Sequence, residues 1–427
     1  MRRAVIMILD GMRRDLVSAA TTPIVHAAAA HGESFARHRS IFPSVTRVSA
    51  ATIATGCRPA RHGLQGNSVA LRENGRLVRR DVGKPEFFDA MRAATGRTLR
   101  VPTLAERVAR AGLDAVAYSN VSPGAAYALD PDGHGVVYHR AGSFAPGRRR
   151  LPDGEGLQVT GDPAGDRVMT ERFCEALEAS QAALSVIWLG EPDHVQHAKP
   201  LGSPAHLAAL RGADDCAARV IETCERIGHH DGEPPLLVLG SDHGHRSMRR
   251  AINLDRALVE AGLKAAPGSD EVVAAANGTA ALIYLDRDAT ARRPAIAEFL
   301  RAQDWVGGVL EGAALADVGL DPDDGTGLAL AVDMRAYDEA NEHGVPGVSD
   351  GVVTEDERPY WLGNGNHGGL ARYEQDPFLI ARGPGFTAGA VRDTPTSLVD
   401  IAPTVLRHLG LPSDGMDGRP LQRSSAT

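Results

Sequence analysis

The chain has 427 residues and a mass of 45.0 kDa, enough for one large domain with an insertion or for two to three units. Hydrophobic residues make up 43% and charged residues 23%, which excludes global disorder. The net charge of −8 excludes a dedicated binder of nucleic-acid polymers or of anionic membranes, and four scattered cysteines exclude a disulfide scaffold.

Apolar runs and helical patterns alternate along the chain. Continuous apolar runs predict strands that are buried on both faces, as in a parallel sheet. The first run is too short for a signal peptide or a membrane span, so we expect a cytoplasmic protein. The pattern indicates an α/β fold with a mostly parallel central sheet sandwiched by helices. The elements are a strand at 4–9, a helix at 103–110, a helix at 166–183, a strand at 184–189, a helix at 206–227 and a strand at 236–239.

The stretch 253–360 has a different character. It contains a strand signal at 280–285, a helix signal near 293–303 and an alternating run at 328–332, and it ends in a Gly-, Asp- and Glu-rich segment. We interpret it as a small α+β cap inserted into the fold. The predicted domains are therefore a core of residues 1–252 and 361–427 and an inserted cap or substrate domain of residues 253–360.

Polar side chains follow the predicted strands at the points where they end. Because ligands of α/β sheets gather at the carboxyl ends of strands, we expect these side chains to meet. A mixture of carboxylates and imidazoles favours Zn²⁺ or Mn²⁺ over Ca²⁺ or Mg²⁺, which prefer oxygen ligands. The segments that supply them are Asp10, Asp193 to His197, Asp242-His243-Gly244-His245, and Asn364 to Gly369 with His367.

A further segment, residues 42–56, predicts a helix that begins near Ser44 and ends at Gly56. Thr46 would then lie at or near the helix N-terminus, where free N–H groups and the helix dipole favour a negative oxygen. From this segment alone, a simple helix cap is the favoured interpretation of Thr46.

Taken together, these motifs share their order with a known family. They are Leu9-Asp10-Gly11, Pro43-Ser44-Val45-Thr46, Thr55-Gly56, Arg58-Pro59-Ala60-Arg61-His62-Gly63, Gly66-Asn67, Glu191 to His197, Ser241-Asp242-His243-Gly244, Asn366-His367-Gly368, and Asp400 to Pro412. The set resembles the alkaline phosphatase superfamily, in its nucleotide pyrophosphatase/phosphodiesterase and phosphonoacetate hydrolase branch. The resemblance spans the whole core, and the insertion stands where that family has its cap.

The resemblance implies two divalent metal ions, with Zn²⁺ as the best fit and Mn²⁺ or Fe as alternatives. It implies that Thr46 is a nucleophile that forms a covalent phosphothreonine. Two cations about 3.5–4 Å apart can stabilise the attacking and the leaving oxygens of a phosphoryl transfer. The implied ligands are Asp193, His197 and His367 for one ion, and Asp10, Thr46, Asp242 and His243 for the other.

The chain departs from the family at the position three residues after the nucleophile, where an Asn donates to a phosphoryl oxygen. That position is Ser49 here, and Asn67 or Arg47 are the other candidates for binding substrate. The two close lysines of phosphonoacetate hydrolases are missing from the corresponding region, 118–123. Cys57 matches a sulfatase pattern but follows Thr55-Gly56 instead of preceding it, so we interpret it as a buried small residue.

The sequence therefore predicts a two-metal hydrolase of phosphoric esters, of the phosphodiesterase or nucleotide pyrophosphatase type. Alternatives are a phosphonoacetate-type hydrolase of C–P bonds, a phosphomonoesterase, a sulfatase and a non-catalytic metal-binding protein. The expected partner is a small phosphoester or phosphonate, and the oligomeric state stays open. His194 and His245 are interpreted as donors to metal ligands or as surface residues, and Asp214-Asp215 as a solvated helix face.

Overall fold

The computed structural model describes residues 2–354, 358–359 and 361–423. Its largest sheet has ten strands within these residues, and β11, β1, β10, β6 and β7 run parallel at its centre. In spatial order the strands are β21 (Val391–Arg392), β2 (Glu33–Phe35), β20 (Leu379–Arg382), β11 (Leu236–Gly240), β1 (Ala4–Leu9), β10 (Leu184–Leu189), β6 (Ala115–Ser119), β7 (Val136–His139), β8 (Phe144–Ala145) and β9 (Arg149–Arg150).

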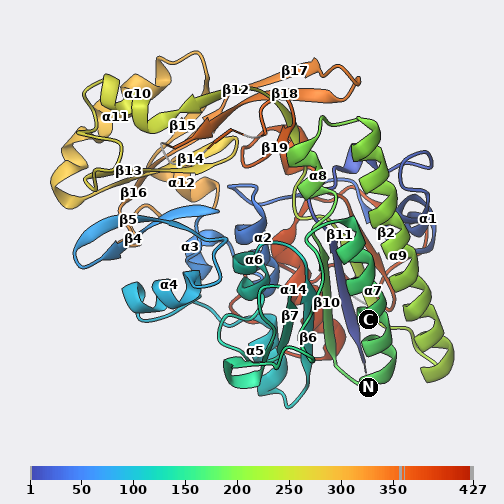
Figure 1. Cartoon of the computed structure of the whole chain (residues 1–427). Helices are drawn as coiled ribbons and strands as arrows, with labels where there is room; N and C mark the ends of the chain where they lie inside the picture. The colour runs from blue at the N-terminus through green and yellow to red at the C-terminus, as the bar shows by residue number, and fades with distance from the viewer. Residues whose placement is uncertain (1, 355–357, 360, 424–427) are drawn as a thin grey trace.

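Helices cover both faces of this sheet (Figure 1). The central strand β1 is buried along its whole length, and its alternate residues belong to two different apolar clusters. Val5, Met7 and Leu9 pack with α1 (Pro23–His31), α7 (Pro163–Ala179) and α9 (Pro204–Asp231). Ala4, Ile6 and Ile8 lie in the cluster that contains residues of α2 (Thr46–Thr55), α5 (Leu104–Arg110), α6 (Pro123–Ala128) and α14 (Ile401–Leu409).

The predicted fold class is therefore confirmed, and the predicted elements differ from the structure mainly at their ends. The strands at 4–9 and 184–189 have the predicted bounds. The helix predicted at 166–183 begins at Pro163, because the Asp162 carboxylate accepts a hydrogen bond from the N–H of Gly165 and caps it. It ends at Ala179, and residues 180–183 lead into β10 instead.

A second sheet lies within the predicted insertion and is antiparallel throughout. One of its faces packs against α10 (Leu254–Glu260) and α11 (Arg293–Arg301), and the other against the hairpin β4–β5. Figure 1 shows the blue hairpin lying along the yellow and orange sheet. The strands are β13 (Val272–Asn277), β14 (Ala280–Leu285), β16 (Leu328–Met334) and β15 (Val306–Leu310), with β4 (Ser68–Glu73) and β5 (Arg76–Asp81) in the hairpin.

A third sheet joins the predicted insertion to the segments that carry His245 and His367. Its strand β12 begins directly after His245, and its strand β19 directly precedes His367. Strand β12 belongs to the predicted core and β18 to the predicted insertion, so their pairing crosses the predicted boundary at residue 253. The boundary between the two domains stays a prediction. In spatial order the strands are β17 (Ala336–Ala340), β18 (Pro346–Val353), β12 (Arg246–Asn253) and β19 (Gly365–Asn366).

Short elements complete the chain. In the described part, no helix has both the length and the apolar character needed to cross a bilayer. The remaining elements are η1 (Arg14–Leu16), β3 (His38–Arg39), α3 (Pro59–His62), α4 (Phe87–Thr95), η2 (Pro146–Arg148), α8 (Asp193–Ala198), η3 (Arg287–Arg292), α12 (Ala313–Asp317), α13 (Arg372–Gln375), β22 (Thr396–Ser397) and η4 (Leu398–Asp400).

Candidate active site

The polar residues that follow the central strands meet at one edge of the large sheet. Asp10 follows β1, Asp193 begins α8 just after β10, and Asp242 follows β11. These three strands are parallel neighbours, so their carboxyl ends lie side by side. All three residues are buried, with exposed fractions of 1%, 7% and 0%.

Thr46 is brought to the same place by helix α2. It is the first residue of the helix, whereas the N-cap position is held by Val45 and has no side-chain hydrogen bond. The Thr46 hydroxyl instead lies 3.1 Å from Nε2 of His243 and 3.5 Å from Oδ1 of Asp10. Thr46 is therefore not the cap of the helix, and its hydroxyl is directed at the carboxylate and imidazole groups.

We call Asp10, Thr46, Asp242 and His243 the inner set. Nε1 of Trp188 donates to Oδ2 of Asp10 at 3.1 Å, and the N–H of Gly11 donates to Oδ1 of Asp242 at 3.1 Å. The Nδ1 of His243 is 3.2 Å from the carbonyl of Gly244, so its Nε2 faces the two carboxylates. Nε2 lies 3.4 Å from Oδ1 of Asp10 and 3.2 Å from Oδ2 of Asp242.

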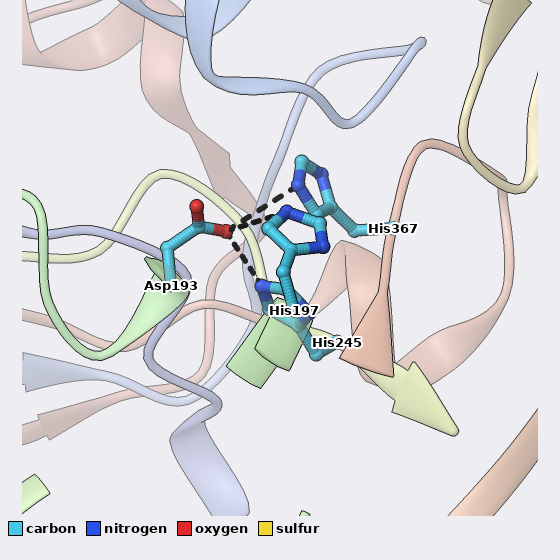
Figure 2. Close-up of side chains that lie close together, drawn as sticks. All are labelled: Asp193, His197, His245 and His367. Atoms are coloured by element: carbon cyan, nitrogen blue, oxygen red, sulfur yellow. Dashed lines mark hydrogen bonds and ion pairs between the residues drawn. The ribbon is translucent and has the colours of Figure 1, made fainter. Parts of the chain in front are cut away.

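We call Asp193, His197 and His367 the outer set, and Figure 2 shows these residues grouped with His245 around one carboxylate. Oδ1 of Asp193 lies 3.4 Å from Nε2 of both His197 and His367. Nδ1 of His197 is 3.1 Å from the carbonyl of Gly365, and Nδ1 of His367 is 2.7 Å from the carbonyl of Ser44. Both rings thus have Nδ1 occupied by a carbonyl and present Nε2 to the carboxylate, the arrangement of a metal-binding histidine.

The electrostatics of the cluster show excess negative charge in a buried place. Burial, together with the charges of Asp242 and Asp193, raises the pKa of Asp10 well above its usual range. Burial likewise raises the pKa of Asp242 to about 7. Burial alone would raise the pKa of Asp193 as well. The charge of His197 and hydrogen bonds from the surrounding imidazoles outweigh burial and hold this pKa well below its usual range. Positive charge at this site would keep all three carboxylates ionised.

The donor set fits a divalent metal ion. Two groups of ligand atoms each lie within 4.8 Å of one another: Asp193, His197, His245 and His367 form one, and Asp10, Asp193 and His243 form the other. Oδ2 of Asp242 is buried and forms no hydrogen bond with the described residues, although Nε2 of His243 lies 3.2 Å from it. A buried oxygen without a partner is costly unless a cation or water satisfies it, and the mixed imidazole and carboxylate donors suit Zn²⁺ or a similar ion.

His245 is the member of the cluster that the sequence did not assign. Its side chain is fully buried, and its Nε2 lies 2.7 Å from Oδ1 of Asp193. His245 is therefore a partner of Asp193, and its interpretation as a surface residue is wrong. The spacing Asp242-His243-Gly244-His245 was the available signal, but it does not show which way the second imidazole points.

A cavity of about 440 Å³ opens beside the cluster. It is lined by Asp10, Thr46, Asp193, His197 and His367, and also by Arg47, Asn67, Ser122, His194 and Asn277. The two candidate substrate-binding residues Arg47 and Asn67 therefore reach the site. Ser49 does not: it is fully buried within α2, is not among the lining residues, and has a hydroxyl with no partner in the described part of the chain.

Two further sequence interpretations concern residues outside the cavity. Cys57 is buried, and its thiol contacts the carbonyl of Gly415 at 3.7 Å, which supports a packing role. The interpretation of Asp214 as a solvated residue is wrong. It is 2% exposed, and its carboxylate accepts hydrogen bonds from the N–H groups of Ile24 and Val25 at the start of α1.

This fold and this cluster define the class of the protein: it is a metal-dependent hydrolase of phosphoric esters in the alkaline phosphatase superfamily. The chain belongs to the type I phosphodiesterase / nucleotide pyrophosphatase family, whose model matches residues 4–369. The resemblance found in the sequence is thereby confirmed.

Solved structures agree with this fold. Murine ectonucleotide pyrophosphatase / phosphodiesterase 5, as an inactive threonine-to-alanine variant in complex with AMP, has a TM-score of 0.69 and 18% identity over 98% of this chain and 97% of that chain. Phosphonoacetate hydrolase from Sinorhizobium meliloti 1021, in complex with phosphonoformate, has a TM-score of 0.62 and 18% identity over 94% of each chain. Among curated proteins, no sequence matches this chain.

Proposed function

We propose that the protein is a phosphodiesterase of the nucleotide pyrophosphatase type that uses two divalent metal ions, best Zn²⁺, and a covalent phosphothreonine at Thr46. The observation that carries the proposal is the position of the Thr46 hydroxyl, 3.1 Å from His243 and 3.5 Å from Asp10, at the N-terminus of α2. The inner set would hold one ion and the outer set the other. When bound, the two cations stabilise negative charge on the attacking and leaving oxygens.

The chemistry of Thr46 follows from this placement. The Thr46 hydroxyl gives up its proton to solvent, its Oγ attacks phosphorus, and the bond between phosphorus and the leaving oxygen breaks, with the leaving oxygen taking the bonding electrons and a proton from water. Water then attacks phosphorus, its oxygen stays on the phosphate, the bond to Oγ breaks, and a proton of that water restores the threonine hydroxyl. The N–H groups of the first turn of α2 and its dipole favour the negative charge that Oγ carries as it attacks.

Asn67 is our candidate for binding a phosphoryl oxygen. Its Oδ1 accepts a hydrogen bond from the N–H of Arg47 at 3.2 Å, which fixes the orientation of the amide. The Nδ2 group has no partner among the residues that the structure describes, and Asn67 lines the cavity. An amide held in this way donates through Nδ2 to a substrate oxygen.

Arg47 favours a second candidate function, which is the hydrolysis of a substrate that carries an additional negative charge. Its Nε donates to the hydroxyl of Ser122 at 3.1 Å, and its Nη1 lies 3.8 Å from Asp81, so the guanidinium is held at the cavity. Ser122 lies in 118–123, the region that corresponds to the two lysines with which phosphonoacetate hydrolases grip the substrate carboxylate and that has no lysine here. Arg47 brings a cation to that segment from α2, as a phosphonate with a carboxylate or a phosphomonoester requires.

A substrate panel tests the proposal. Zinc-loaded protein is assayed with bis(p-nitrophenyl) phosphate, p-nitrophenyl phosphate, p-nitrophenyl sulfate and phosphonoacetate. We expect turnover of the diester, and a mass increase on a peptide containing Thr46 after acid quenching. Preference for phosphonoacetate or the monoester would instead support the second candidate. Bound metal without hydrolysis of any of these compounds would contradict the proposal.

A further inference from the structure

The turn between β13 and β14, residues 277–279, lies against the segments that carry Asn67 and His367. We call it the insertion turn. Gly278 has a φ of +71°, and a Cβ built on it would lie 1.9 Å from the carbonyl oxygen of His367. A Cβ built on Gly368 would lie 1.8 Å from the carbonyl oxygen of Asn277. Two backbone segments therefore touch where neither has room for a side chain.

On one side, the turn holds the backbone of Asn67. Asn277 is 2% exposed, and its Oδ1 accepts hydrogen bonds from the N–H of Asn67 at 2.6 Å and of Ser68 at 3.3 Å. Its Nδ2 donates to the carbonyls of Ser68 and Ala275 at 3.2 and 3.1 Å. One buried amide thus binds the start of β4 to the end of β13, and it fixes the residue whose own side chain faces the cavity.

On the other side, the turn holds the segment that carries His367. The N–H of Thr279 donates to the carbonyl of His367 at 3.1 Å, and the Thr279 hydroxyl accepts from the N–H of Gly369 at 2.8 Å. The same hydroxyl donates to the carboxylate of Glu374. These bonds hold the backbone at His367 and at Gly369, two residues further on, while Nδ1 of His367 contacts the carbonyl of Ser44.

We infer that the insertion turn positions both the phosphoryl-binding amide of Asn67 and the metal ligand His367, so that the insertion helps to build the catalytic site in addition to covering it. The inference rests on the proposed function. Asn277 and Thr279 are positioning residues, because they act through Asn67 and His367 and the inference requires no contact of their own with substrate.

The two roles of the insertion turn predict different losses: weaker zinc binding where His367 loses its support, and slower hydrolysis where Asn67 does. Thr279→Val keeps the shape of the side chain but removes the hydroxyl, and we expect about a 10- to 100-fold loss of affinity for one of two zinc ions in a titration with zinc alone. Thr279→Ser keeps the hydroxyl and should restore zinc binding. Asn277→Ala should bind both zinc ions as the wild type does, but its kcat/KM for bis(p-nitrophenyl) phosphate should fall about 10-fold or more.

Ile283→Ala is the matched control. Ile283 lies on β14, is fully buried and packs away from the turn in the apolar cluster shared with α10 and α11. Its removal should lower the melting temperature while leaving zinc affinity and kcat/KM unchanged. If Thr279→Val and Asn277→Ala match Ile283→Ala in zinc affinity and in kcat/KM, the inference is overturned. A wild-type protein that binds no zinc or hydrolyses none of the panel compounds would overturn the proposed function instead.

Discussion

The inner and outer sets differ in what holds their side chains. The inner carboxylates follow strands of the central sheet, and their partners, Trp188 and the N–H of Gly11, belong to β10 and to the end of β1. The outer set takes His197 from a helix of six residues and His367 from a loop that packs on the insertion turn. Asp242 and His243 are fully buried, whereas the His197 side chain is 19% exposed. The inner set thus takes Asp10, Asp242 and His243 from the ends of central strands, whereas the two histidines of the outer set come from a short helix and a loop.

Replacing Thr46, the proposed nucleophile, gives the largest effect expected in the inner set. In Thr46→Ala, we expect kcat to fall by at least about 10³-fold, because no hydroxyl remains to attack phosphorus. The outer set does not include Thr46, so the variant should retain at least the outer metal ion. Steady-state kinetics and elemental analysis of the same preparation check both statements. Residual turnover near that of the wild type would show that Thr46 is not the nucleophile.

Chelator titration tests the difference between the sets directly. Because the outer ligands are more exposed and lie on shorter elements, we expect the outer ion to leave first and at about 10-fold lower chelator concentration. Elemental analysis should pass through a stage with one ion per chain. In His367→Ala that first step should disappear, whereas in Asp242→Ala the remaining ion should be the weakly held one. A single step that removes both ions from the wild type would contradict the distinction.

His245 provides a test inside the outer half of the site. Its Nε2 lies 2.7 Å from Oδ1 of Asp193, so His245→Ala removes a group that fixes the carboxylate. We expect zinc affinity to weaken by about 10- to 100-fold at one site, with the inner ion retained. His230→Ala, at a histidine side chain that is 89% exposed, is the control and should bind both ions normally. Equal zinc affinity in the two variants would mean that His245 only fills space.

The contrast between the sets also explains which parts of the site could be predicted from sequence. Asp10 and Asp242 follow uninterrupted apolar runs, and parallel strands bring their ends together, so local patterns were sufficient. The contact of His245 with Asp193 joins residues 52 positions apart and depends on the direction of a loop, which no local pattern encodes. Ser49 and Asp214 were misplaced for the same reason. The helix start that Asp214 caps lies about 190 positions earlier in the chain, and the complete burial of Ser49 depends on packing that its own helix pattern does not show.

The smallest expected effect concerns the support beneath α2, which carries Thr46. His62 is fully buried, its Nε2 contacts the hydroxyl of Thr52 on α2 at 3.1 Å, and its Nδ1 accepts from the N–H of Leu64. Burial, aided by the charge of Arg100, lowers the pKa of His62 to about 3. Because the unfolded chain has the ordinary pKa of about 6.5, it binds more protons than the folded protein between pH 6.5 and 3. The stability that this neutral histidine contributes is therefore present above pH 6.5 and is lost as the pH falls.

Urea unfolding of wild type and His62→Gln at pH 7 and pH 5 measures this contribution. We expect the wild type to lose about 2 kcal/mol of unfolding free energy from this one group over that interval, and His62→Gln to lose correspondingly less. The metal ligands are the same in both proteins, so their titration cancels in the difference when both are studied without metal. Equal losses in the two proteins would mean that His62 is protonated in the fold and that α2 does not rest on a neutral imidazole.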